Sequence, residues 1–274
     1  MYISQPEALE WKLKNFTKDN TRIVTDFDST ITQHNGKTSW SLFSDSWLMP
    51  ESYSQRRNAL KEQYHPFEID SMLTDDVRSE YMRIWWMKHL ELLREYKLER
   101  DILERIVLHE MHIRNGFDRW LRAMHELQIP VLILSAWITQ SIETVLRWQW
   151  LLSPNITITS NLLRFDEAGI CIWVDGSHII HATNKDDAQI SMELQEQWKN
   201  RTNIILLWDS LDDIRMIQPH ERERTIAIGF NTSNRRHQLS EFYSTFDITI
   251  ESDTDDNGII EVLLSKIRNN QANR

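Results

Sequence analysis

The sequence predicts an α/β fold, a doubly wound parallel sheet with a helical segment inserted after its first strand. Three observations lead to this prediction. Short runs rich in β-branched residues alternate with segments of helical periodicity. The runs are apolar at consecutive positions, as expected of strands that are buried on both faces of a parallel sheet. One long segment with only helical patterns interrupts the alternation.

The first predicted strand is RIVTDFD, which begins at Arg22, and the interruption follows it, from about Gln33 to Asn115. Apolar residues recur every three or four positions in SEYMRIWWMKHLELLREY and LERDILERIVLHEMHI, which indicates helices. We therefore expect a helical cap domain of residues 33–115 and a core domain made of residues 1–32 and 116–274.

Helices and strands alternate again after this segment. The predicted helix GFDRWLRAMHELQ precedes the strand PVLILSA, TQSIETVLRWQWLL precedes ITITSN, and DAQISMELQEQWKN precedes NIILLWDS. TIAIGF and FDITIES are the last two predicted strands, and the acidic stretch ESDTDDNG is expected to be a solvated loop. We expect four tryptophans of the helical segments to be core residues: Trp120, Trp148, Trp150 and Trp198.

Composition and charge argue against several classes of protein. The chain has 31 Lys and Arg against 41 Asp and Glu, a formal net charge of −10, and no dense basic run, so we expect no nucleic acid polymer as a partner. The single cysteine, Cys171, cannot form an intramolecular disulfide, and the N-terminal residues are charged where a signal peptide is apolar. No apolar run approaches the ~20 residues of a membrane span. We expect a cytoplasmic protein without a membrane partner.

Acidic and hydroxyl side chains follow three of the predicted strands. Asp26 and Asp28 follow the first, Ser135 the second, and Asp209 a third, with Asp213 one helical turn onward. The carboxyl ends of parallel strands meet at one edge of a sheet, so these side chains are expected to share a crevice. Clustered carboxylates repel one another unless a cation lies between them, and hard oxygen ligands suit Mg²⁺, which also accepts substrate phosphate. The sequence therefore predicts a Mg²⁺ and phosphate site.

Four segments, VTDFDSTIT, LSAWI, HATNKDD and LLWDSLDD, resemble the four motifs of the haloacid dehalogenase-like (HAD) phosphohydrolases. Within that superfamily the arrangement is similar to the cytosolic pyrimidine 5'-nucleotidases, which have counterparts of YHPFEIDSMLTDD and YMRIWWMKHLELL in their inserted segment. The resemblance covers most of the chain. It implies a Mg²⁺-dependent phosphomonoester hydrolase that acts through an aspartyl-phosphate intermediate.

The resemblance also implies residue roles. Asp26 would be the nucleophile, and Asp28 would protonate the leaving oxygen and later activate water, which agrees with carboxylate chemistry. Ser135 and Lys185 would hold the phosphate oxygens. The Mg²⁺ ligands would be Asp26, Asp28 through its main-chain carbonyl, Asp209 and Asp213. The other expected substrate-binding residues are Thr30, Ala136, Trp137, Trp85 and Trp86, where one of the adjacent pair Trp85 and Trp86 faces the crevice.

Three positions depart from the family pattern and leave the substrate open. Trp137 and Trp208 replace glycines, and Ile84 replaces a glutamate thought to meet the nucleobase. The replacement of that glutamate by Ile84 is expected to shift the preference toward a more apolar or differently shaped leaving group. We expect both indoles to border the site, where they could equally stack on a base. The expected partner is a small phosphorylated metabolite such as a nucleoside 5'-monophosphate. Non-catalytic binding of a phosphoryl ligand and phosphotransfer to an alcohol are the alternatives.

Overall fold

The computed structural model describes residues 1–34, 39–70, 72–174, 179–181, 183–185, 191–211, 217–256 and 258–272. Its main element is a seven-stranded sheet in the order β1-β9-β8-β7-β2-β3-β4. Every neighbouring pair is parallel except β1 and β9. The strands are β1 (Tyr2–Ile3), β2 (Thr21–Thr25), β3 (Val131–Ile138), β4 (Ile156–Asn161), β7 (Asn203–Trp208), β8 (Thr225–Phe230) and β9 (Ile248–Ile250).

This sheet confirms the predicted α/β fold and all six predicted strands. The register places Val24 of β2 opposite Leu132 on one side and Leu206 on the other. Consecutive residues alternate between the faces, since Ile23 packs in one apolar cluster and Val24 in the other. Both faces are covered, which is why these runs are apolar at consecutive positions. The two-residue β1 is too short to show a pattern.

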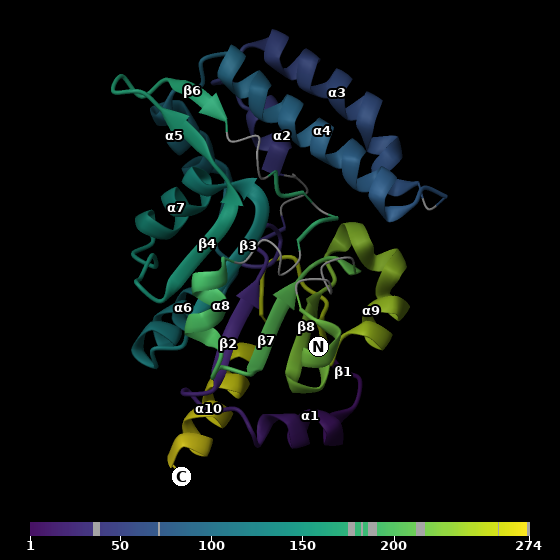
Figure 1. The fold of residues 1–274 in the computed structure, drawn as a ribbon, viewed down its shortest axis with the longest axis vertical. Coiled ribbons are helices and arrows are strands. Elements are labelled where there is room, and N and C mark those ends of the chain that lie inside the picture. Colours follow the sequence, from purple (N-terminus) through teal and green to yellow (C-terminus); the bar gives the residue numbers. More distant parts are fainter. Residues whose placement is uncertain are drawn as a thin grey trace.

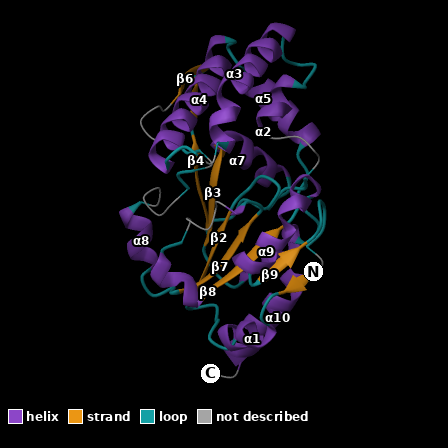
Figure 2. Cartoon of the chain, turned by 90° about the vertical axis from the view of Figure 1, so that its right-hand side faces the viewer, coloured by secondary structure: helices purple, strands orange, loops and turns teal. Residues whose placement is uncertain are grey.

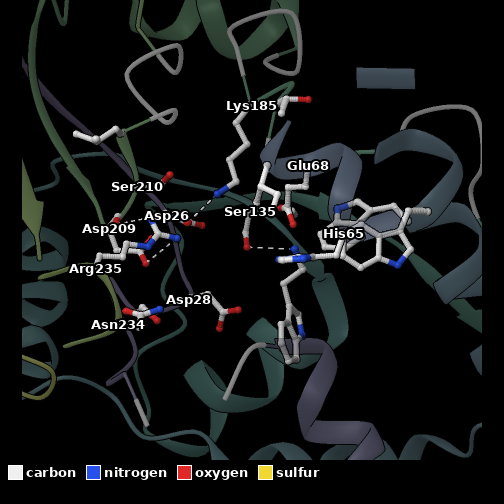
Figure 3. A pocket seen from close by; sticks show the side chains of 18 of the residues that line it. Asp26, Asp28, His65, Glu68, Ser135, Lys185, Asp209, Ser210, Asn234 and Arg235 are labelled. Atoms are coloured by element: carbon white, nitrogen blue, oxygen red, sulfur yellow. Dashed lines mark hydrogen bonds and ion pairs between the residues drawn. The ribbon is translucent and has the colours of Figure 1, made fainter. Parts of the chain in front are cut away.

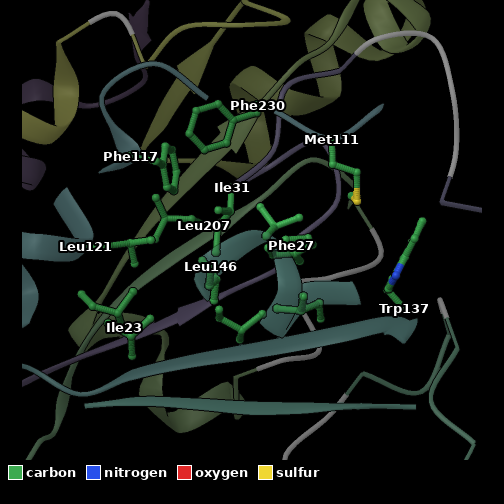
Figure 4. Packing of buried hydrophobic residues seen from close by; sticks show 14 of the residues in the cluster. Ile23, Phe27, Ile31, Met111, Phe117, Leu121, Trp137, Leu146, Leu207 and Phe230 are labelled. Atoms are coloured by element: carbon green, nitrogen blue, oxygen red, sulfur yellow. The ribbon is translucent and has the colours of Figure 1, made fainter. Parts of the chain in front are cut away.

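Helices cover both faces of the sheet (Figures 1 and 2). Residues of α1 (Pro6–Leu13), α6 (Phe117–Glu126), α7 (Thr139–Trp148) and α10 (Ile259–Ala272) belong to the larger cluster. Figure 4 shows its centre, where Phe117 and Leu121 of α6 lie near Ile31 and Leu207. Residues of α8 (Met192–Trp198) and α9 (Leu239–Thr245) belong to the cluster on the other face.

The segment between β2 and α6 contains four described helices: α2 (Ser39–Ser44), α3 (Glu51–Ile69), α4 (Asp75–Glu95) and α5 (Arg100–Glu110). They stand above the carboxyl ends of the strands (Figure 1). Aromatic pairs join α3 to α4, with the Phe67 and Tyr81 ring centroids 3.8 Å apart. The hairpin of β5 (Leu163–Phe165) and β6 (Cys171–Val174) is tied to this segment, because the Cys171 amide donates to the Leu98 carbonyl. The division into a core and a cap at residues 33 and 115 stays a prediction.

The helical segment is joined to the sheet by two linker segments that pair with each other. Thr32 and Ile113 form an antiparallel bridge, and the Arg114 amide donates to the Ile31 carbonyl at 2.8 Å. Because these two linker segments lie side by side, the chain leaves the sheet and returns to it at one place. Among the helices of the described ranges, none combines the length and apolar character that a transmembrane span requires.

Two expectations about packing are wrong. Trp120 and Trp198 are buried as expected, but Trp148 is 68% exposed and Trp150 is 87% exposed. Trp148 is the last residue of α7, and Trp150 follows it with a φ of 55°. Both therefore lie past the part of the helix that packs on the sheet. The acidic stretch is not wholly solvated either, because Asp256 is 3% exposed.

Candidate active site

The carboxyl ends of neighbouring strands bring Asp26 and Asp209 together. Asp26 follows β2 and Asp209 follows β7, and the Asp26 amide donates to the carbonyl of Leu207 at 3.0 Å. Both carboxylates are buried, and both line a cavity of about 740 Å³ that Asp28 and Ser135 also line (Figure 3). These four residues therefore share one crevice, as the strand-end argument requires.

Lys185 reaches the same point from far along the chain. Its Nζ donates to Asp26 Oδ2 at 2.7 Å, and both side chains are buried. The loop before Lys185 is shaped by Asn184, whose side chain accepts from the His181 amide and donates to the Ile179 carbonyl. This buried pair places a cation directly against the carboxylate predicted to be the nucleophile.

Opposing influences set the pKa of Asp26. Burial raises the pKa of Asp26 most, the positive charge of Lys185 lowers it, and the negative charge of Asp209 raises it, with a net increase. Asp26 Oδ1 also accepts a hydrogen bond from the Phe27 amide at 2.7 Å, which favours the charged form. A cation between Asp26 and Asp209 would remove the repulsion between them.

The donor set at this point fits Mg²⁺, because it consists of two buried carboxylates at adjacent strand ends. Within the described ranges, no group of three His, Cys, Asp or Glu side chains is arranged to hold a metal ion. The predicted ligand Asp213 lies outside the described residues. The remaining ligands would come from that segment, from main-chain oxygens, or from water and substrate, which Mg²⁺ commonly retains.

A second cation, which sequence reasoning missed, lies beside Asp209. The 3₁₀ helix Ser233–Gln238 brings Asn234, Arg235 and His237 to the cavity. Arg235 Nη1 donates to the Asp209 carbonyl at 2.5 Å, and its Nη2 lies 3.6 Å from Asp209 Oδ2. The sequence signal was the basic run in SNRRHQ, but no pattern relates that run to β7.

The turn after Asp28 is held by a buried arginine. Ser29 has a positive φ of 56°, a conformation that non-glycine residues rarely adopt. Arg114 is fully buried and donates to the Ser29 carbonyl at 2.5 Å and the Thr30 carbonyl at 2.9 Å. It also donates to the carbonyls of Ser252 and Asp255. Arg114 thus fixes the backbone that follows Asp28.

The same contacts correct the prediction for Thr30. Its side chain is 0% exposed, it does not line the cavity, and its hydroxyl has no hydrogen-bond partner among the described residues. Because Ser29 turns the chain sharply, Thr30 points into the interior instead of toward a substrate. Its carbonyl serves as an anchor for Arg114.

Asn161, the last residue of β4, joins two loops of the site. Its amide nitrogen donates to the carbonyls of Ala136 and Ile180, and its oxygen accepts from the Ile180 amide. Ala136 lies in the motif that contains Ser135, and Ile180 lies in the loop that leads to Lys185. Asn161 is buried, and sequence reasoning missed it although it ends a predicted strand.

Three tryptophans contribute to the cavity wall. Trp85 and Trp86 of α4 both line the cavity, although only one was expected to, and Trp137 and Ala136 of β3 line it as expected. Trp208 does not line it: this side chain is 0% exposed and packs 4.7 Å from the Phe246 ring. The alternation along β7 directs Trp208 to the sheet face covered by α8 and α9. Ile84 does not line the cavity either.

Comparisons with known proteins agree with this geometry. The sequence model of the pyrimidine 5'-nucleotidase (UMPH-1) family matches residues 25–268. A 7-methylguanosine phosphate-specific 5'-nucleotidase of Gallus gallus is 29% identical over 96% of this chain and 95% of its own length. The Homo sapiens protein of that name is 29% identical over 86% of this chain and 81% of its own.

Solved structures show the same fold. A crystal structure of cytosolic 5'-nucleotidase IIIB bound to cytidine superposes with a TM-score of 0.85 at 26% identity, covering 100% of this chain and 95% of that one. A phospho-aspartyl intermediate analogue of phosphoserine phosphatase superposes with a TM-score of 0.55 at 15% identity, covering 89% of this chain and 99% of that one. The second likeness concerns the fold alone.

Proposed function

Because this chain belongs to the pyrimidine 5'-nucleotidase (UMPH-1) family and is a phosphatase of the HAD fold, we propose that it releases phosphate from a nucleoside 5'-monophosphate or a similar small phosphate ester through an aspartyl-phosphate on Asp26. The observation that carries the proposal is the buried contact of Lys185 with Asp26, next to Asp209, at the floor of the cavity.

In the first step, a carboxylate oxygen of Asp26 attacks phosphorus and the bond from phosphorus to the ester oxygen breaks. Asp28, which lines the same cavity two residues away, gives its proton to the leaving oxygen. In the second step Asp28 takes a proton from water, which attacks phosphorus and releases inorganic phosphate. Asp26 and Asp28 are then ready for another cycle.

Two other side chains hold the phosphate. The positive charge of Lys185 lowers the pKa of Asp26 against the effect of burial, and Lys185 donates to the phosphate oxygens, with the Ser135 hydroxyl as a second donor. Mg²⁺, held by Asp26, Asp209, Asp213 and the main-chain carbonyl of Asp28, would neutralise charge on the phosphate oxygens when bound. Phosphoryl transfer depends mainly on such positioning and charge stabilisation.

A nucleoside leaving group is supported by the cavity wall and by the relatives. Trp85, Trp86 and Trp137 offer aromatic faces on which any base can stack. The names of the relatives specify 7-methylguanosine phosphate, and the solved 5'-nucleotidase IIIB holds cytidine. We therefore propose a nucleotide as the substrate class.

The test is phosphate release from p-nitrophenyl phosphate and from a panel of nucleoside 5'-monophosphates, including 7-methylguanosine 5'-monophosphate, with and without Mg²⁺. We expect Mg²⁺-dependent release that Asp26→Asn abolishes. The matched control is Asp101→Asn, an exposed carboxylate on α5, which should have no effect. Full activity in Asp26→Asn would contradict the proposal, as would the absence of release from every ester.

A further inference from the structure

One face of α3 carries the charged side chains that line the cavity from the helical segment. Arg57, Lys61, His65 and Glu68 all line it, and their spacing of four, four and three residues places them on one side of the helix. Figure 3 shows His65 and Glu68 across the pocket from Asp209 and Arg235. The side chains of α3 therefore face whatever is attached to a phosphate bound at Asp26.

The charges along this face are separated by sign. Arg57 and Lys61 are neighbours with Cβ atoms about 6 Å apart, as residues four positions apart in a helix are. Glu68 is eleven residues from Arg57, about 16 Å along the helix axis at 1.5 Å per residue. Glu68 is thus too far away to neutralise Arg57, and the Arg57 end of this α3 face carries two positive charges, those of Arg57 and Lys61.

Among the described residues, no carboxylate lies beside the buried cation Arg57. Arg57 is 6% exposed, and within the described part of the chain no Asp or Glu oxygen lies within 4 Å of its guanidinium. Its Nη1 donates to Asn58 Oδ1 at 3.1 Å, and its Nε is buried with no hydrogen-bond partner in the described residues. Asp45 acts on Arg57 only from a greater distance. An unpaired buried charge is costly, which calls for a partner that the described residues do not supply.

The neighbours of Arg57 do not compensate its charge. Burial together with the Arg57 charge lowers the pKa of His89 on α4 to about 3, so the His89 imidazole is neutral. The Tyr53 hydroxyl, one turn before Arg57, is buried without a described partner. Three other cations of the cavity wall contact carboxylates: Lys185 contacts Asp26, Arg235 contacts Asp209, and Arg78 contacts Asp75.

We propose that Arg57, with Lys61 beside it, binds a second phosphate carried by the leaving group of the substrate. The substrate class is then a bisphosphorylated small molecule, with one phosphate at Asp26 and Lys185 and the other at α3. A guanidinium matches phosphate because its fork of donors bonds two oxygens at once. The inference rests on the proposed function for the position of the first phosphate. Nucleoside bisphosphates and sugar bisphosphates both carry such a second phosphate.

Binding, measured without turnover, tests this assignment separately from catalysis. In the Asp28→Asn background with Mg²⁺, isothermal titration calorimetry compares adenosine 3',5'-bisphosphate with adenosine 5'-monophosphate, and fructose 1,6-bisphosphate with fructose 6-phosphate. We expect at least one bisphosphate to bind about tenfold more tightly than its monophosphate, and Arg57→Met to remove that preference. A preference in the adenosine pair identifies the leaving group as a nucleoside phosphate, and a preference in the fructose pair identifies it as a sugar phosphate.

Arg56→Met is the matched control. Arg56 is the preceding residue of α3, but it is 53% exposed and its Nη2 lies 2.7 Å from Glu95 Oε2 instead of lining the cavity. We expect Arg56→Met to keep the preference for the bisphosphate. Equal binding of both bisphosphates and their monophosphates, or a preference that Arg57→Met leaves intact, would overturn the assignment. Loss of phosphate release with the preference retained would overturn only the proposed function.

The thermal stability of the ligand-free protein gives a second readout. Met has a length and flexibility that fill the space of the Arg57 side chain, and it removes the unpaired buried charge. Arg57→Met should therefore raise the Tm of the ligand-free protein, while it abolishes the extra Tm increase that the bisphosphate gives over the monophosphate. A Tm below that of the wild type would show that Arg57 stabilises the helical segment by itself, and it would contradict a binding role.

Discussion

Replacing Arg114 with Met tests how the turn after Asp28 is held. Arg114 donates to four carbonyl oxygens, those of Ser29, Thr30, Ser252 and Asp255, at distances of 2.5 to 3.3 Å. Hydrogen bonds from a charged donor contribute about 1.5–3 kcal/mol each, but the removal of a buried charge offsets part of the loss. We therefore expect the free energy of unfolding to fall by about 3–5 kcal/mol.

Activity should fall as well, because the carbonyls of Ser29 and Thr30 belong to the turn directly after Asp28. Urea unfolding followed by circular dichroism gives the stability, and phosphate release gives kcat and KM. The control is Arg119→Met, an arginine of α6 that is 65% exposed and lies 3.5 Å from Glu261, for which a change below about 0.5 kcal/mol is expected. A change this small in Arg114→Met would refute the argument that Arg114 holds the turn.

Three further predictions concern buried residues. Because burial lowers the pKa of His89 from 6.5 to about 3, the unfolded chain binds a proton between these pH values that the folded chain does not. The free energy of unfolding should fall as the pH falls through this window, by at most about 5 kcal/mol, and urea titrations of His89→Met should show a weaker dependence. A Cβ at Gly229 would meet Phe246 at 2.5 Å, so Gly229→Ala should lower the free energy of unfolding by about 1–3 kcal/mol, measured by urea titration. Asn161→Ala removes three hydrogen bonds, two of them buried, and should lower both the Tm and kcat, and an unchanged kcat would separate Asn161 from the site.

The strands and the carboxylates of the site were predictable because they depend on local pattern. A strand buried on both faces is continuously apolar, and the residue after it lies at the sheet edge. Asp26, Ser135 and Asp209 could therefore be assigned to one crevice from the amino-acid pattern alone. The motif resemblance added Lys185, which no periodicity relates to Asp26, and the 2.7 Å contact confirms that the two lie together.

The residues that were missed or wrongly placed depend on contacts between distant segments. Arg114, Asn161 and Arg235 donate hydrogen bonds to backbone carbonyls of other loops. Because every residue has a backbone carbonyl, the sequence does not indicate which carbonyls accept these hydrogen bonds. Thr30 and Trp208 follow or end predicted strands, but the positive φ of Ser29 and the alternation along β7 turn both side chains into the interior. Such directions depend on one backbone angle or one register position.

Trapping the covalent intermediate shows whether Asp26 is the nucleophile. The wild-type protein is quenched during turnover of p-nitrophenyl phosphate with Mg²⁺, and borohydride then reduces any acyl phosphate to an alcohol, which peptide mass spectrometry locates. We predict homoserine at position 26 and at no other aspartate, and none in a sample without substrate. Continued release of phosphate with no modification at Asp26, or with modification at another aspartate, would contradict the account.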